Sequence, residues 1–158
     1  MRIVITGADG FIGRNLSVRL GELGHTDIAR ITLDSSDEDL KAALKGADFV
    51  SHLAGINRPK DVSEFATGNA GLTETVCSLL AEYGNKAPVV LSSSTQAALD
   101  NPYGQSKLAN MMFARELQRR FEAAGSTKKA YYVHPGVSAT GLFARTDTPL
   151  DLVMKPAV

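Results

Sequence analysis

Cysteine, net charge and long apolar runs are all scarce in this sequence. It has one cysteine, Cys77, no tryptophan, and 17 Lys+Arg against 17 Asp+Glu in 158 residues. One cysteine excludes an internal disulfide framework and suits a reducing compartment, so we expect a cytoplasmic protein. A net charge of zero argues against a nucleic-acid or anionic-membrane partner, because either would need a basic face. No apolar run approaches the roughly 18 residues of a membrane-spanning helix, and the short run after Arg2 does not have the form of a signal peptide.

The composition that is present is typical of one globular domain. Hydrophobic residues make up 44% and charged residues 22%, values that exclude a disordered chain. A chain of 158 residues is long enough to bury one core of its own. We expect residues 1–142 to form this domain and residues 143–158 to be a C-terminal tail, because the alternation of strand and helix patterns does not extend into that segment.

Strand-like and helix-like patterns alternate along the chain. Short β-branched runs predict strands at 3–5, 28–33, 49–53, 89–91 and 131–133. Amphipathic stretches predict helices at 11–23, 37–44, 70–83 and 103–124. The alternation predicts an α/β fold, a three-layer, Rossmann-like, doubly wound parallel sheet. Only one helix fits between the second and third strands, so the predicted order of the five strands is 2-1-3-4-5.

Three glycines separate the first predicted strand from the first helix. Gly7, Gly10 and Gly13 have the spacing G-x-x-G-x-x-G, and Thr6 precedes them. Glycines at this junction allow a tight turn, a close approach of the backbone to a pyrophosphate, and close helix–strand packing. The free N–H groups at the helix start favour the same negative charge. The predicted cofactor-binding residues of the loop are Gly7, Asp9, Gly10, Phe11, Ile12 and Gly13.

An acidic residue stands at the distance expected for a ribose ligand. Asp34 follows Gly13 by 21 positions, at the end of the second predicted strand. A carboxylate there accepts hydrogen bonds from ribose hydroxyls and repels a 2′-phosphate, which favours NAD over NADP. Arg14 and Arg30 are the basic residues that could contact a 2′-phosphate, so both cofactors stay open at this stage.

A tyrosine and a lysine four residues apart begin the longest predicted helix. This spacing places Tyr103 and Lys107 on one helical face, one turn apart. A free phenol keeps its proton until about pH 10, and a nearby lysine cation favours the ionised form, so the pair suits acid–base catalysis. Ser92, Ser93 and Ser94 end the fourth predicted strand, at the edge where open α/β sheets bind ligands. A hydroxyl there could donate a hydrogen bond to a substrate carbonyl.

Together these motifs resemble those of the short-chain dehydrogenase/reductase superfamily, in particular its extended branch, which modifies nucleotide sugars. The resemblance implies a Ser–Tyr–Lys triad of Ser94, Tyr103 and Lys107, with Ser93 as the fallback serine. It also implies that Lys107 binds the nicotinamide ribose. The other cofactor contacts that it implies are Leu53, Ala54 and Gly55 beside the adenosine ribose, Asn69 at a helix start, and Pro135, Gly136, Val137 and Thr140 near the carboxamide.

The resemblance differs between the two ends of the chain. Residues 1–107 resemble the nucleotide-sugar reductases of capsular polysaccharide synthesis, mainly through residues 52–59 and 92–104. Residues 107–142 instead resemble single-domain, retinol-dehydrogenase-like members. Two origins stay open at this stage: a chimeric or engineered chain joined near the shared Tyr-x-x-x-Lys motif, and natural drift.

The sequence therefore predicts an NAD(P)-dependent oxidoreductase that moves hydride between the nicotinamide cofactor and an unidentified small carbonyl or alcohol substrate. Two alternatives stay open: a nucleotide-binding scaffold without turnover, and a nucleotide-sugar reductase or epimerase. The three histidines lie far apart without ligand spacing, so we expect no metal site. The resemblance also suggests a homodimer formed through the helix from Tyr103 and the helix around residues 72–80.

Overall fold

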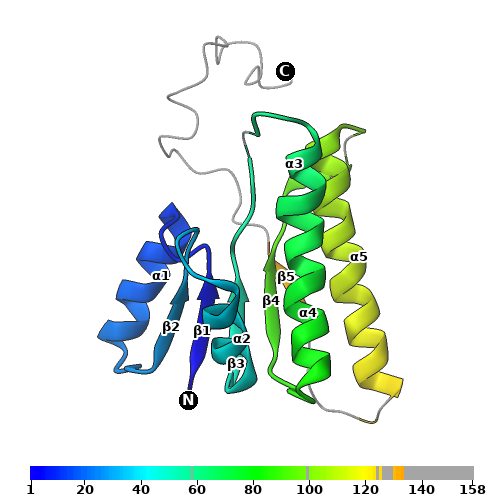
Figure 1. Ribbon diagram of the computed structural model, residues 1–158. Coiled ribbons are helices and arrows are strands. Elements are labelled where there is room, and N and C mark those ends of the chain that lie inside the picture. Colours follow the sequence, from blue (N-terminus) through cyan, green and yellow to red (C-terminus); the bar gives the residue numbers. More distant parts are fainter. Residues whose placement is uncertain (58, 99, 124, 126–129, 134–158) are drawn as a thin grey trace, which may run out of the picture.

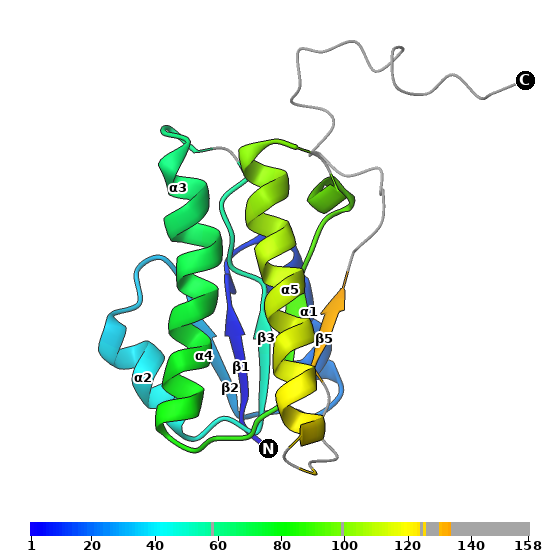
Figure 2. The same ribbon diagram turned by 90° about the vertical axis from the view of Figure 1, so that its right-hand side faces the viewer.

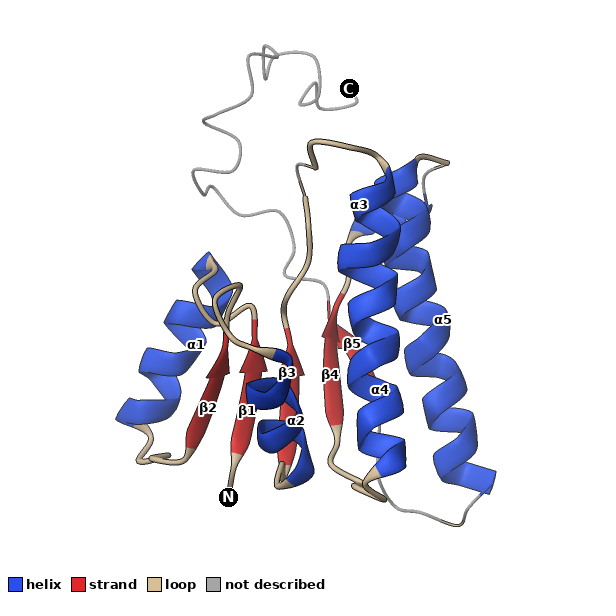
Figure 3. Cartoon of the chain, in the orientation of Figure 1, coloured by secondary structure: helices blue, strands red, loops and turns tan. Residues whose placement is uncertain are grey.

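The computed structural model describes residues 1–57, 59–98, 100–123, 125 and 130–133. Its five-stranded parallel sheet has the order β2-β1-β3-β4-β5, which confirms the predicted fold class and strand order (Figure 3). The strands are β1 (Ile3–Thr6), β2 (Ile28–Ile31), β3 (Phe49–His52), β4 (Val89–Ser92) and β5 (Tyr131–Val133). The predicted tail of residues 143–158 and the boundary at 142 lie outside the described residues and stay predictions.

Helices cover both faces of the sheet. The helices are α1 (Phe11–Glu22), α2 (Asp37–Lys45), α3 (Ser63–Phe65), α4 (Leu72–Glu82) and α5 (Pro102–Ala123), with a π-helical turn η1 (Ala66–Gly71) and a 3-10 turn η2 (Thr95–Ala98). Figures 1 and 2 together show α1 on one face and α2, α4 and α5 on the other. The three layers predicted from the sequence are therefore present.

Successive side chains of β1 point to opposite faces of the sheet and belong to two apolar clusters. Ile3 and Ile5 point to one face and pack against Leu16 and Leu20 of α1. Val4 points to the other face, into a larger cluster shared with α2, α4 and α5. Both faces of a parallel strand are buried in this way, which is why the strand reads as a continuous apolar run. Full burial of each such side chain contributes about 1.5–3 kcal/mol to folding.

Two elements differ from the predicted ranges by more than one residue at an end, and hydrogen bonds explain the first. β2 ends at Ile31, before the predicted residue 33, because Thr32 begins a turn. The Thr32 hydroxyl accepts from the Asp34 N–H over 3.2 Å, and the Thr32 carbonyl accepts from the Ser35 N–H over 3.3 Å. The helix predicted at 70–83 is present as α4, and residues 70 and 71 belong to the π-helical turn before it.

The register of the sheet brings the site segments to one edge. Thr6 at the end of β1 is paired with Ile31 of β2 and His52 of β3. Because the strands are parallel, the loops that follow them all leave from this carboxyl edge, where open α/β sheets bind ligands. Among the described residues, no helix is long and apolar enough to cross a membrane.

Candidate functional site

Only glycine fits at two positions of the glycine loop, one crowded by the segment after β3 and the other by the loop itself. Gly7 has a φ of +68°, and a Cβ there would lie 2.7 Å from the backbone nitrogen of Ala54. A Cβ at Gly13 would lie 2.8 Å from Ala8 Cα and would overlap the Gly7 carbonyl oxygen. At Gly10 the nearest atom to such a Cβ is 3.2 Å away, a tighter contact than usual but not a closed one. The backbone thus forms the close cradle that a pyrophosphate requires.

The start of α1 fits an anion as well. Its N-cap, Gly10, provides no side-chain hydrogen bond, and no acidic residue occupies the first turn. The first N–H groups of a helix have no partner within the helix, and with the helix dipole they attract negative charge. Phe11 and Ile12, both predicted cofactor contacts, are exposed at this helix start.

A groove of about 560 Å³ lies beside the glycine loop. Four segments form it: the glycine loop, the turn between β2 and α2, the loop after β3, and η1 with the start of α4. Its volume is in the range of small-molecule and cofactor sites. The predicted cofactor contacts that line it are Gly7, Asp9, Gly10, Leu53, Ala54 and Gly55.

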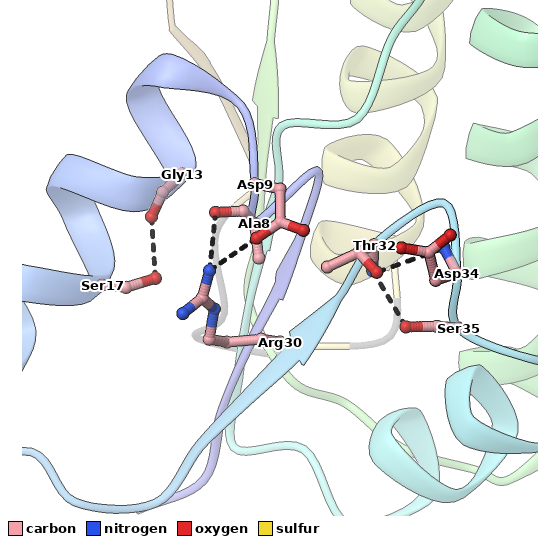
Figure 4. A network of polar contacts seen from close by, with 8 residues as sticks. All are labelled: Ala8, Asp9, Gly13, Ser17, Arg30, Thr32, Asp34 and Ser35. Atoms are coloured by element: carbon pink, nitrogen blue, oxygen red, sulfur yellow. Dashed lines mark hydrogen bonds and ion pairs between the residues drawn. The ribbon is translucent and has the colours of Figure 1, made fainter.

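The carboxylate that lines the groove is not the one that the sequence singled out. Asp34 is exposed and is absent from the groove lining, whereas Asp37 at the start of α2 belongs to it. The backbone N–H of Asp34 donates to Thr32 Oγ1 in the turn that leads toward α2 (Figure 4). The ribose role predicted for Asp34 stays a prediction, and Asp37 is a second candidate for it.

Arg30 points toward the glycine loop (Figure 4). Its Nη2 lies 2.7 Å from Asp9 Oδ1 and 3.4 Å from the Ala8 carbonyl oxygen. About half of each charged side chain is exposed, so the ion pair contributes only about 0–1 kcal/mol. The ion pair mainly fixes a position, because it holds the Arg30 side chain against the glycine loop. Arg14, the other candidate for a 2′-phosphate contact, is exposed.

The structure brings Tyr103, Lys107 and Gly55 together. Lys107 is 4% exposed, and burial lowers the pKa of its ammonium group. Its Nζ lies 5.7 Å from the centroid of the Tyr103 ring, within the range of a cation–π contact. A Cβ at Gly55 would lie 2.9 Å from Lys107 Nζ, so the lysine reaches the wall of the groove. The Tyr103 ring also packs against Phe65, with 5.5 Å between the centroids.

Asn69 is fully buried in η1, and its side chain joins two segments of the site. Its Oδ1 accepts from the Ile56 N–H over 2.6 Å, and its Nδ2 donates to the Ile56 carbonyl over 3.1 Å. Nδ2 also donates to Ser106 Oγ over 2.9 Å, and Ser106 Oγ donates to the Tyr103 carbonyl over 2.8 Å. Asn69 therefore holds the loop after β3 against α5. π-Helical turns often mark functional sites, and η1 fits that pattern.

The two candidate serines differ in their surroundings. Ser93 is 8% exposed, and its Oγ has no hydrogen-bonding partner among the described residues. Ser94 is half-buried and leads into η2, which packs on α5. Asn101 then caps α5, where its Oδ1 accepts from the Gly104 N–H over 2.7 Å. The described part of the connection from Ser94 to α5 thus holds a 3-10 turn and a helix cap.

Four predicted contacts near the carboxamide lie outside the described residues: Pro135, Gly136, Val137 and Thr140. Within the part of the chain that the structure describes, no three His, Cys, Asp or Glu side chains gather as they would around a metal ion.

Sequence reasoning missed the apolar walls of the groove. Leu33 is fully exposed, and Ile56 and Leu72 also line the groove. A Cβ at Gly68 would collide with the Ile56 side chain, so this glycine lets η1 approach the loop. No sequence signal marked Leu33, because the predicted strand at 28–33 includes it. The Gly68 contact had no signal either, because it joins segments 12 residues apart.

Comparison with known proteins gives a family and several relatives. A profile of the NAD dependent epimerase/dehydratase family matches residues 3–127. The chain is 42% identical over 109 residues to UDP-2-acetamido-2,6-beta-L-arabino-hexul-4-ose reductase of Pseudomonas aeruginosa, a match that covers 69% of this chain and 29% of the relative. It is 30% identical over 118 residues to retinol dehydrogenase 12 of Mus musculus, covering 75% of this chain and 28% of that protein. The chain thus spans less than a third of the length of these curated relatives.

Solved structures resemble the fold closely. The capsular polysaccharide assembling protein CapF from Staphylococcus aureus aligns with a TM-score of 0.67 and 41% identity, covering 84% of this chain and 34% of that one. A short-chain dehydrogenase/reductase superfamily protein from Agrobacterium tumefaciens, solved with bound NAD, aligns with a TM-score of 0.68, covering 85% of this chain and 48% of that one. Its sequence identity is 20%, so this second likeness concerns the fold alone.

Proposed function

Because the chain belongs to the NAD dependent epimerase/dehydratase family, we propose that it is an NAD(P)-dependent oxidoreductase of the short-chain dehydrogenase/reductase type. The cofactor would lie in the groove beside the glycine loop, and hydride would pass between its nicotinamide and a carbonyl or alcohol substrate. One observation carries the proposal. Lys107 Nζ lies 2.9 Å from the position of a Cβ at Gly55, so the helix that bears Tyr103 reaches the groove wall.

The residues of the chain have separate roles in this proposal. The glycine loop and the start of α1 hold the pyrophosphate. Lys107 donates to the nicotinamide ribose, and its ammonium group lies against the Tyr103 ring. Tyr103 gives or takes a proton at the substrate oxygen, and the Ser94 hydroxyl donates a hydrogen bond to the same oxygen. When bound, the nicotinamide supplies or accepts the hydride at the substrate carbon.

We favour NAD over NADP as the cofactor. Two carboxylates support this choice, Asp34 next to the groove and Asp37 in its lining, because either would repel a 2′-phosphate. The ion pair between Arg30 and Asp9 supports it too, since that arginine is already paired with a carboxylate of the glycine loop.

Two other functions remain candidates, each on one observation. A nucleotide-sugar substrate, reduced or epimerised, is supported by the 42% identity to the Pseudomonas aeruginosa reductase. Cofactor binding without turnover is supported by the short connection between Ser94 and Tyr103, which limits how the two hydroxyls can converge.

Fluorescence titration with NADH and NADPH, followed by turnover assays on a carbonyl panel and on nucleotide sugars, separates these functions. We expect NADH to bind more tightly than NADPH and Tyr103→Phe to bind NADH while losing turnover. Binding without turnover by the wild type would establish the non-catalytic alternative. Equal turnover by Tyr103→Phe would remove the tyrosine from the mechanism, and lack of binding to both cofactors would refute the proposed function.

A homodimer through α4 and α5 is a further part of the proposal. A second groove of about 560 Å³ lies between these helices, and Phe113 and Leu117 contribute to its lining. Leu108 and Met112 are exposed on α5. Light scattering of the purified protein measures the oligomeric state, and a mass equal to one chain would refute the dimer.

Cytoplasmic location and a chimeric origin stay proposals. The first is supported by the single cysteine, Cys77, whose thiol pKa burial raises to about 12, which keeps it protonated and unreactive. The second is supported by matches to both branches, a nucleotide-sugar reductase at 42% identity and a retinol dehydrogenase at 30% identity. Separate searches with residues 1–105 and 106–158 test the chimera, and retrieval of one branch by both would refute it.

A further inference from the structure

A buried chain of hydrogen bonds runs through His52. Its Nδ1 lies 2.7 Å from Thr6 Oγ1 on β1, and its Nε2 lies 3.0 Å from Thr73 Oγ1 on α4. Thr6 and His52 are each 1% exposed, and Thr73 is 2% exposed. A buried polar group that loses its partner is costly, so these bonds constrain one another strongly.

The hydrogen-bond partners at each end fix which ring nitrogen of His52 carries the proton. Thr73 Oγ1 has one proton, and its other neighbours are both acceptors, the Asn69 carbonyl at 2.8 Å and Asn110 Oδ1 at 3.0 Å. A hydroxyl that donates to one of these oxygens accepts from His52 Nε2–H, and the Thr6 hydroxyl, which already accepts from the Ala54 N–H, has its own proton to donate to Nδ1. Nδ1 then has no proton and accepts from the Thr6 hydroxyl. Burial and the charge of Lys107 lower the pKa of His52 to about 4, which agrees with a neutral ring.

The ends of this chain belong to the two halves of the proposed site. At one end, the Ala54 N–H donates to Thr6 Oγ1 over 3.2 Å, and Ala54 lines the cofactor groove. At the other end, Asn110 follows Lys107 by three residues on α5 and so lies on the same helical face. These hydrogen bonds thus connect the groove wall to α5, the helix that bears the Tyr103–Lys107 pair.

We propose that His52 is a positioning residue, which holds the cofactor groove in register with the Tyr103–Lys107 pair. The role rests on the proposed function, because it requires a cofactor in the groove. A neutral imidazole accepts at one nitrogen and donates at the other in a fixed geometry. Asparagine would keep an acceptor near Thr6 but would not reach Thr73, so His52→Asn cuts the chain at a single bond.

A set of threonine variants tests the role. Thr73→Val removes the hydroxyl at nearly constant volume, and Thr73→Ser retains it. Thr75→Val is the matched control, because Thr75 Oγ1 also donates to the carbonyl four residues earlier, over 3.0 Å, but is exposed. We expect Thr73→Val to weaken NADH binding about five- to tenfold, as for one buried hydrogen bond. Thr73→Ser and Thr75→Val should bind NADH as the wild type does.

Two further measurements distinguish positioning from loss of stability. Leu80→Ala destabilises α4 at its far end, outside the chain of hydrogen bonds, and should leave the NADH affinity of the folded protein unchanged. Imidazole 15N spectra of the free wild-type protein at pH 6 should show His52 neutral with the proton on Nε2. His52→Asn replaces Thr73→Val if the latter does not fold, with the same expected weakening.

Each outcome has one consequence. Wild-type protein that binds neither NADH nor NADPH refutes the proposed function and the positioning role with it. Wild-type binding that Thr73→Val and His52→Asn leave unchanged refutes the positioning role alone. A weakening that Leu80→Ala reproduces, or a His52 proton on Nδ1, also refutes the positioning role while the proposed function stands.

Discussion

Gly7 and Gly13 determine how closely β1, the loop after β3 and α1 approach one another. A Cβ at either position would collide with backbone rather than with a movable side chain. The positive φ of Gly7 adds a second requirement, since L side chains rarely adopt it. The cradle therefore depends on the absence of a Cβ atom at Gly7 and Gly13.

Alanine substitutions test this cradle. We expect Gly7→Ala and Gly13→Ala each to lower the free energy of unfolding by about 1–3 kcal/mol and to abolish NADH binding, because the backbone must shift. Gly21→Ala in α1 is the control, since nothing lies within 4 Å of its Cβ position. The free energy of unfolding of Gly21→Ala should be about 0.5–1 kcal/mol higher than that of the wild type. Urea unfolding and NADH titration measure both effects, and equal stability of all three variants would contradict the crowding.

Lys107 shows the opposite case, a charged group kept where it costs stability. It is buried, and no carboxylate among the described residues acts on its ammonium. We expect Lys107→Met to raise the free energy of unfolding by about 1–2 kcal/mol while turnover is lost, because a buried cation without a carboxylate partner leaves the interior.

The same lysine predicts a pH dependence. Burial lowers the Lys107 pKa in the folded state, so at alkaline pH the unfolded chain binds more protons than the folded one. Stability contributed through this group therefore rises with pH, and Lys107→Met should lose that slope. Unfolding measured at pH 7 and pH 9 checks both statements, and a methionine variant less stable than the wild type would contradict them.

At the scale of elements, the start of α2 places negative charge at the groove. Ser36 and Asp39 form a capping box, in which Asp39 Oδ2 accepts from the Ser36 N–H over 2.9 Å and Ser36 Oγ accepts from the Asp39 N–H over 3.2 Å. The Ser36 hydroxyl also donates to Asp39 Oδ2 over 2.7 Å, and this bond, together with the one from the Ser36 N–H, lowers the pKa of Asp39. The cap fixes where the helix begins and thereby turns Asp37 into the groove lining.

This geometry predicts which carboxylate selects the cofactor. Asp37→Asn should tighten NADPH binding relative to NADH by about fivefold, the effect of one charge pair in a wet site. Asp34→Asn should change that ratio less, because Asp34 does not line the groove. Parallel titrations with both cofactors give the ratios, and a larger effect at Asp34 would restore the assignment made from the sequence.

His52 connects β3 to β1 and α4, and it predicts acid sensitivity. Its ordinary pKa is 6.5, and burial with the charge of Lys107 lowers it to about 4. Between these values the unfolded chain binds the proton first, so stability falls as the pH drops, by up to about 1.4 kcal/mol per pH unit. His52→Asn should lose that contribution. Urea unfolding between pH 4 and pH 7 measures it, and identical slopes for both proteins would contradict the shift.

For the whole molecule, a ligand that binds only the folded state stabilises every element at once. NADH at about 100 times its dissociation constant should add about 2.7 kcal/mol to the free energy of unfolding. For a domain of this size that corresponds to a rise of about 6–10 °C in Tm. Tyr103→Phe should show the same rise and Gly7→Ala none. A thermal scan at several NADH concentrations gives the result, and a Tm independent of NADH would contradict cofactor binding.

Much of the whole-molecule architecture follows from short-range patterns. Alternating strand and helix periods predict the layers, and the room for only one helix between β2 and β3 predicts the strand order, which the structure confirms. The glycine spacing and the Tyr-x-x-x-Lys motif were also readable, because turn geometry and helical faces depend on residues within a few positions of each other.

Only the tertiary structure decided which of these residues meet. Whether Asp34 or Asp37 lines the groove depends on the turn at Thr32 and on the cap of α2. A sequence pattern cannot distinguish two carboxylates that lie three residues apart. The ion pair of Arg30 with Asp9 and the contacts of His52 with Thr6 and Thr73 join segments 21 to 46 positions apart. Such contacts follow from strand register and helix packing, and neither is encoded in the neighbouring residues alone.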